Sequence, residues 1–235
     1  MNSNGVFKVK REAVVNNVQG NSRFSVVYET LKKKIIEGDL PSNTPLVEEK
    51  LAKEYQMSRT PIREAIRQLV QDGLVEFFPR RGALVKEITI DELEEIFTVR
   101  EALEGISARI AASVINEQKI TLLQEALEMA DQELENGDKE QSFELGNKLH
   151  EIVLDVAGNN KILTIVSDFQ NQIQRYHYFA YHIPGRLELS NKEHWEIFEA
   201  IQARNGELAE RRMRKHVRGT KESTIFAVKN NIRTI

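Results

Sequence analysis

The chain has 235 residues, of which 40% are hydrophobic and 29% are charged, and its formal net charge at pH 7 is −3. It contains no cysteine, which excludes disulfides, thiolate metal sites and cysteine nucleophiles. Because no apolar run approaches the roughly 18 residues of a membrane span and the first 20 residues carry no signal-peptide pattern, we expect a cytoplasmic protein without a membrane partner.

Short helices are expected after an N-terminal extension that spans residues 1–21. Ser22 is a candidate N-cap for the first helix, which runs to about Glu37. The second helix spans Val47–Tyr55, and Gln56-Met57 connects it to a third. Two short helices joined by such a tight turn are typical of a helix-turn-helix.

The third helix carries the most informative pattern in the chain. Ser58 is its candidate N-cap, and Asp72-Gly73 ends it. Arg59, Arg63 and Arg67 recur every four residues, so they form one basic stripe along the helix. Arginine suits phosphate groups and guanine edges. The stripe indicates a DNA-contacting face, although an ordinary solvated helix face has the same pattern.

Two short strands, Leu74–Phe78 and Ala83–Lys86, are expected on either side of a basic tip, Pro79-Arg80-Arg81-Gly82. Three helices and this hairpin predict a winged helix-turn-helix, in which the tip reaches a groove or a phosphate. The residues expected at the DNA are Lys50, Ser58, Arg59, Thr60, Arg63, Arg67, Arg80, Arg81 and Gly82.

The balance of charge changes along the chain. Residues 22–88 contain 12 Lys/Arg and 10 Asp/Glu, whereas residues 89–235 contain 18 Lys/Arg and 25 Asp/Glu. The first segment has a formal net charge of +2 and the second of −7. This asymmetry predicts a DNA-binding domain at residues 22–88, followed at residues 89–235 by an acidic domain for effector binding and dimerisation.

The second domain has a helical pattern throughout. Thr89-Ile90-Asp91-Glu92 is a capping box that opens a long helix. Its apolar residues expected to face inward are Leu93, Ile96, Phe97, Leu103, Ile106 and Ile110. Further helices are expected over residues 120–135, 139–157, 161–182, 190–203 and 206–228. The predicted fold is mainly α, with an antiparallel bundle of about six helices after the winged helix-turn-helix.

The N-terminal domain resembles a known family. The segment Gly38–Val85, GDLPSNTPLVEEKLAKEYQMSRTPIREAIRQLVQDGLVEFFPRRGALV, is similar to the DNA-binding domain of GntR-type bacterial transcription regulators. The likeness extends over roughly residues 24–86. One position departs from the family pattern, because Glu49 stands where a phosphate-contacting arginine is usual, with Lys50 beside it.

The helical domain resembles the FCD effector domain of the FadR branch of that family, over about residues 91–222. The motifs that carry the likeness are Arg100, Leu103 and Glu104; His150 with Gly158-Asn159; the run from His194 to Ile201; and the run from Ala209 to His216. The resemblance implies a dimeric, ligand-responsive regulator that binds a palindromic double-stranded DNA operator.

Three of the five histidines, His150, His194 and His216, lie near the middles of separate predicted helices. Such positions can converge inside a bundle, and three neutral imidazoles suit Zn or Ni better than Mg or Ca. A single helix histidine is more often a surface or core residue. The resemblance favours a metal, because the family's three metal-binding histidines match these positions.

The fourth ligand of the family does not match. It is usually an aspartate one turn before the first histidine, and that position here is Gly146. Two interpretations are open: a three-histidine site completed by water or a ligand, or a site that holds no metal. A divalent cation without the aspartate carries one more uncompensated positive charge, which favours an anionic effector such as a carboxylate.

Candidate effector-binding residues are Arg100, Arg175 and Tyr178. For Arg100 two interpretations have equal weight: an ion pair with Glu104, four residues on, and a wall of the effector cavity, which the resemblance favours. The predicted function is therefore a transcription regulator that responds to a small organic acid.

There are two alternatives to this function. One is a body that serves only for dimerisation, and the other is a helical metalloenzyme fused to a DNA-binding head. Enzymatic activity is not expected, because the chain has no HExxH, GxSxG or phosphate-loop motif.

Overall fold

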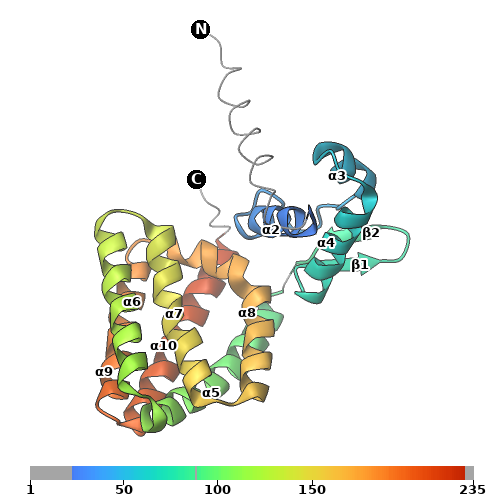
Figure 1. The fold of residues 1–235 in the computed structure, drawn as a ribbon. Helices are drawn as coiled ribbons and strands as arrows, with labels where there is room; N and C mark the ends of the chain where they lie inside the picture. The colour runs from blue at the N-terminus through green and yellow to red at the C-terminus, as the bar shows by residue number, and fades with distance from the viewer. Residues whose placement is uncertain (1–22, 88, 231–235) are drawn as a thin grey trace. The chain divides into compact units, whose positions relative to one another are not determined.

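The computed structural model describes residues 23–87 and 89–230. The predicted N-terminal extension and the candidate cap Ser22 lie outside these residues. The chain divides into two units, Met1–Glu87 and Ile88–Ile235, and each unit is described by itself (Figure 1). They are called the head and the body below.

The head is a winged helix-turn-helix, as the sequence predicts. Its elements are α2 (Arg23–Ile36), α3 (Glu48–Glu54), α4 (Arg59–Gln71), β1 (Val75–Phe78) and β2 (Gly82–Val85). The two strands are antiparallel, with Val75 opposite Val85 and Phe78 opposite Gly82. Pro45 forms an isolated bridge with Leu84, so the segment before α3 lies beside the wing.

The amphipathic pattern of α4 explains its place in the head. Ile62, Ala65, Ile66 and Leu69 are buried in the core of this unit, and the arginine stripe is exposed on the other face. Ser58 occupies the N-cap position with extended backbone, as predicted, but its side chain makes no capping hydrogen bond.

The body consists of helices over the described residues. They are α5 (Ile90–Val114), α6 (Glu117–Glu135), α7 (Lys139–Ala157), α8 (Asn160–Tyr181), α9 (Arg186–Gln202) and α10 (Gly206–Lys229). Neighbouring helices such as α6 and α7 run side by side (Figure 1). The predicted mainly helical fold is confirmed, although α6 and α9 begin a few residues earlier than the sequence pattern suggests.

Polar caps set where these helices begin. Thr89 and Glu92 form the predicted capping box at the start of α5. At the starts of α6, α7, α8 and α10, the side chains of Asn116, Asp138, Asn159 and Asn205 accept backbone N–H bonds. Gly158 ends α7 with φ of +65°, a left-handed conformation that glycine adopts without strain.

The inward face of α5 differs from the one expected. Leu93, Ile96 and Phe97 are buried as predicted, but Ile106 is 40% exposed. Arg100 and Glu104 are buried instead. The reason is close packing against α10: a Cβ added at Gly105 would lie only 2.7 Å from Cγ of Arg214, so the small-residue face of α5 turns toward that helix.

None of the helices in the described residues is long and apolar enough to cross a membrane.

Candidate DNA-binding surface and histidine cluster

The arginine stripe of α4 faces solvent. The side chains of Arg59 and Arg63 are 63% and 52% exposed, and Arg67, Ser58 and Thr60 are exposed as well. An exposed row of guanidinium groups on the second helix of a helix-turn-helix is suited to phosphates and guanine edges in the major groove.

One carboxylate stands among these arginines. Nε and Nη2 of Arg63 donate to the two carboxylate oxygens of Glu48, both at 2.9 Å. Nη2 of Arg59 lies 3.7 Å from the same carboxylate. The hydrogen bonds from Arg63 hold the pKa of Glu48 below its usual value. Glu48 is the first residue of α3, so the first helix of the motif presents an acid, rather than a base, to the recognition helix.

The wing presents further cations. Arg80 has φ of +68° and Gly82 has φ of +76°, so the tip turns through two left-handed residues. Arg80 and Arg81 are exposed, and the guanidinium of Arg81 lies 5.8 Å from the ring centroid of Phe78. Lys50 is exposed on α3, and Gly82 is half-buried. The sequence-predicted DNA residues thus lie on α3, α4 and the wing tip.

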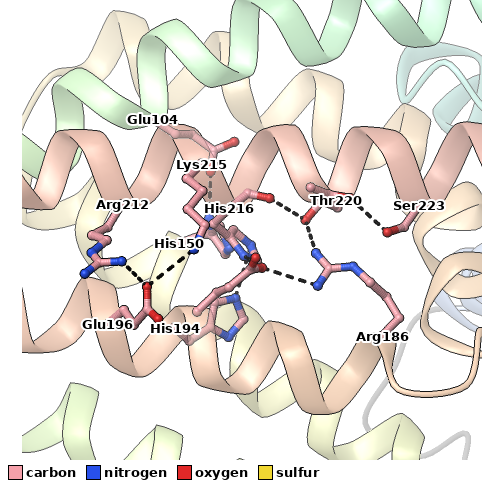
Figure 2. A network of polar contacts seen from close by, with 12 residues as sticks. Glu104, His150, Arg186, His194, Glu196, Arg212, Lys215, His216, Thr220 and Ser223 are labelled. Atoms are coloured by element: carbon pink, nitrogen blue, oxygen red, sulfur yellow. Dashed lines mark hydrogen bonds and ion pairs between the residues drawn. The ribbon is translucent and has the colours of Figure 1, made fainter.

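In the body, three histidines from three helices meet in the interior. His150 on α7, His194 on α9 and His216 on α10 are each no more than 4% exposed. Their rings point toward one another (Figure 2), with centroids 4.6 to 5.3 Å apart. One ring nitrogen from each lies within 4.8 Å of those of the other two. The structure therefore brings together the three histidines singled out by the sequence.

Two of these histidines have a carboxylate behind them. Nδ1 of His150 lies 2.6 Å from Oε2 of Glu104, and Nδ1 of His216 lies 2.9 Å from Oε2 of Glu193. An ionised carboxylate accepts, so each Nδ1 donates and each Nε2 keeps its lone pair for the centre of the cluster. Carboxylates behind histidines are the usual support of a metal site.

An arginine backs each carboxylate in turn. Nε of Arg100 donates to Glu104 at 2.6 Å, and Nη1 of Arg186 donates to Glu193 at 3.3 Å. The ion pair of Arg100 with Glu104, one of the two interpretations of Arg100, is therefore present. Burial raises the pKa of Glu104, but the charge of Arg100 and the hydrogen bonds with Arg100 and His150 outweigh it and keep that pKa well below its usual value.

Burial keeps imidazoles in this region neutral. It lowers the pKa values of His194 and His216 well below the usual value, and the neighbouring histidine charges lower them further. Burial also raises the pKa of Glu193, although Arg186 opposes this effect. Neutral imidazole is the form that binds a metal, so His194 and His216 are in their ligating form at neutral pH.

The third histidine faces the glycine that replaces the family's aspartate. Nδ1 of His194 is buried and has no hydrogen-bond partner among the described residues, and the same holds for Oδ1 of Asn191. A Cβ at Gly146 would lie 3.1 Å from Nδ1 of His194 and 3.5 Å from Oδ1 of Asn191. The ring of His194 therefore fills the space in which a side chain at position 146 would begin.

The residues present suit a transition metal. Three buried imidazoles, two of them oriented by carboxylates, form a nitrogen donor set of the kind that Zn or Ni prefers. Glu104, Glu193, Arg100 and Arg186 were not among the metal-site residues that the sequence suggested. Only the spacing of Arg100 and Glu104, four residues apart, gave a signal. The pairs of Glu104 with His150 and of Glu193 with His216 join different helices, and Arg186 and Glu193 are seven residues apart on α9.

A small cavity lies between α7, α8, α9 and α10. It has a volume of about 30 Å³, and its polar lining residues are His177, Arg186, Ser190 and Thr220. Arg100 does not line it, but its Nη1 lies 3.2 Å from Nε2 of His177. The side chains of Arg175 and Tyr178 lie outside the described part of the structure.

Comparisons with known proteins agree with both units. Residues 24–85 match the family model of the bacterial regulatory proteins of the gntR family, and residues 95–219 match that of the FCD domain. The chain is 28% identical over 197 residues to the HTH-type transcriptional repressor RspR of Escherichia coli strain K12, which covers 84% of this chain and 86% of the relative.

A second relative is the HTH-type transcriptional regulator YdhC of Bacillus subtilis strain 168. It is 30% identical over 190 residues, which cover 80% of this chain and 85% of the relative. Among solved structures, that of E. coli McbR/YncC has a TM-score of 0.72 at 22% identity, over 90% of this chain and 99% of that one. This likeness shows a shared fold.

Proposed function

Because the chain belongs to the GntR family of bacterial regulatory proteins and carries an FCD domain, it is a DNA-binding transcription regulator, and we propose that a small organic acid bound in its body controls operator binding. The family and its relatives are regulators rather than enzymes, so the metalloenzyme alternative is set aside.

At the DNA, the chain acts as a homodimer on a palindromic operator. One recognition helix spans only a short half-site, and two-fold dimers are the commonest oligomers. The exposed stripe of α4 supplies base and phosphate contacts, and Arg80 and Arg81 supply contacts from the wing. Exposed Val99 and Ile106, seven residues apart on α5, support dimerisation through the body. Light scattering of the full chain at micromolar concentration tests the dimer.

The histidine cluster holds a divalent transition metal, with Nε2 of His150, His194 and His216 as ligands. The buried carboxylates Glu104 and Glu193 orient two of these rings, which is the main support for a metal over a purely structural cluster. When bound, the metal supplies a positive charge and an open coordination position at the centre of the bundle.

The charges around the cluster indicate what the open position takes. The carboxylates of Glu104 and Glu193 are balanced by the guanidinium groups of Arg100 and Arg186, and the imidazoles of His194 and His216 are kept neutral by burial. A divalent cation therefore adds two positive charges to a buried region that is otherwise balanced. Because uncompensated buried charge is costly, an anionic ligand such as a carboxylate is favoured. This balance is the observation that carries the proposal.

The test measures metal uptake, acid binding and operator binding on the same protein. Zinc titration by calorimetry after chelator treatment should show uptake by the wild type and none by His194→Ala. His182→Ala, which changes a histidine outside the cluster, should bind zinc as the wild type does. Zinc-loaded wild type should then show a thermal shift with at least one member of a panel of small carboxylic acids. The same acid should change gel-shift affinity for the operator.

Two outcomes would contradict the proposal. Without zinc uptake at neutral pH, the cluster is not a metal site. If no acid changes operator affinity, the body serves only for dimerisation.

A further inference from the structure

The small cavity beside the histidine cluster contains one buried cation. Arg186 begins α9 and is 8% exposed. Its guanidinium lies in a wall that is otherwise formed by the apolar side chains Phe143, Ala180 and Leu187 and the neutral groups His177, Ser190 and Thr220. Burial keeps the pKa of His177 well below its usual value, so Arg186 is the charged group among the described lining residues.

The partners of Arg186 leave much of its hydrogen-bonding capacity unused. Among the described residues, Nη1 donates to Glu193 at 3.3 Å and Nη2 donates to Thr220 at 2.9 Å. Three of the five N–H donors of an arginine are therefore not engaged by these two bonds. The bond to Glu193 is longer than the 2.7–2.9 Å usual for a guanidinium and a carboxylate. The same oxygen of Glu193 also accepts from His216.

The volume of the cavity fits the head group of a small acid. Its volume of about 30 Å³ exceeds the roughly 10–15 Å³ that one water needs, so it accommodates a group of two or three atoms. The hydroxyl of Ser190 can donate to an anion there, and the remaining lining is mostly apolar. Arginine binds a carboxylate with two parallel N–H bonds, which its present single bond to Glu193 does not provide.

We propose that this cavity is a carboxylate-binding subsite in which Arg186 is the anchoring cation. The inference deepens the proposed sensing function, and its biological role rests on that function. The metal and Arg186 bind two groups of one acid, or each binds a separate acid. The ligand class is a small carboxylic acid with a short apolar chain.

Arg186 is connected to a metal-site histidine by two routes. Glu193 accepts from Nη1 of Arg186 and from Nδ1 of His216. The hydroxyl of Thr220 accepts from Nη2 of Arg186 and donates to the backbone carbonyl of His216 at 3.0 Å (Figure 2). A bound ligand carboxylate draws Arg186 away from Glu193. The side chain of Glu193 then loses its cationic partner, which strengthens its hydrogen bond with His216. Occupation of the cavity and the geometry of the cluster are therefore coupled.

The test uses metal-free full-length protein, so that an acid cannot bind through a metal. Acetate is the probe, and its binding is followed by saturation-transfer NMR. Chloride is added as the competing anion at equal ionic strength. Wild type should bind acetate in preference to chloride. The double variant Arg186→Gln/Glu193→Gln removes both charges of the pair, which avoids leaving one buried charge alone. It should bind acetate about tenfold more weakly, the loss expected for one charge-assisted contact.

Glu193→Gln alone tests the opposite direction. It keeps Arg186 but removes its competitor, so acetate should bind more tightly than in the wild type. Equal acetate binding by the wild type and the double variant would overturn the proposal, and so would equal responses to acetate and chloride. Acetate binding at Arg186 without any change in operator affinity would leave the subsite in place and remove the sensing function. If operator affinity still responds to the acid in the double variant, the sensing function stands and the subsite at Arg186 is refuted.

Discussion

Arg63 is engaged by its own protein in the absence of DNA. Both carboxylate oxygens of Glu48 accept from its guanidinium, and those N–H groups are the ones that a guanine edge or a phosphate would use. The pair is exposed, so water and salt weaken it, and DNA can displace Glu48. Glu48 thus holds the guanidinium of Arg63 in place in the absence of DNA.

Replacing Arg63 by alanine is expected to weaken specific operator binding by about 1–3 kcal/mol, because a base-edge or phosphate contact is lost. The fold should remain intact, since this side chain is exposed and outside the head core. Gel-shift titration at a stated salt concentration measures the loss, and circular dichroism checks the fold. Glu64→Ala, an exposed neighbour on α4, is the matched control and should not bind more weakly. Unchanged affinity of Arg63→Ala would refute the docking of α4.

Gly146 distinguishes the histidine cluster from a four-ligand site, in which an aspartate at this position would be the fourth ligand. Gly146→Ala places a Cβ 3.1 Å from Nδ1 of His194, so the ring must shift and zinc affinity should fall. Gly146→Asp has the same steric effect but adds a ligand and removes one positive charge. It should bind zinc more tightly than the alanine variant and bind carboxylates more weakly than the wild type. Calorimetric zinc titration of the three proteins distinguishes charge from steric effects. An aspartate variant no tighter than the alanine variant would refute this account.

At the scale of elements, the caps make separate contributions to stability. The capping box of Thr89 satisfies two backbone N–H groups at the start of α5, a helix that supplies Arg100 and Glu104 to the buried network. Thr89→Ala should lower the free energy of unfolding of the body by about 1 kcal/mol. Urea unfolding followed by the fluorescence of Trp195, the single tryptophan, measures the change. Thr121→Ala, at an exposed position within α6, should have a smaller effect. Equal effects of the two would show that the cap is not responsible.

At the scale of the whole molecule, the buried histidines make stability depend on pH. Burial lowers the pKa values of His177, His194 and His216 in the folded state, so the unfolded chain binds more protons once the pH falls below about 6.5. Stability is therefore fully present above that value and is lost on acidification. With three such groups the slope can reach about 4 kcal/mol per pH unit. Glu193, whose pKa is raised by burial, opposes this effect.

Urea unfolding of metal-free protein at pH 7.5, 6.5 and 5.5, followed by Trp195, measures this dependence. His177→Gln removes one of the three groups and should reduce the slope by about a third. A free energy of unfolding that does not change between pH 7.5 and 5.5 would contradict the buried neutral state of the three histidines.

The sequence by itself determined the helical class, the winged helix-turn-helix and the arginine stripe, because these follow from periodicity and caps that act over a few residues. Ser58, Thr89 and Gly158 stand at helix ends for that reason. The family pattern also indicated His150, His194 and His216, whose convergence the fold then produced.

Only the tertiary structure decided which polar groups meet across helices. Glu104 with His150, Glu193 with His216, and Glu48 with Arg63 join residues 15 to 46 positions apart, and no local pattern encodes such pairs. The inward face of α5 was likewise set by α10, because Gly105 lets that helix approach and turns Ile106 outward. Arg186 acquired its place in the same way, since α8, α9 and α10 must pack together before there is a cavity for it to line.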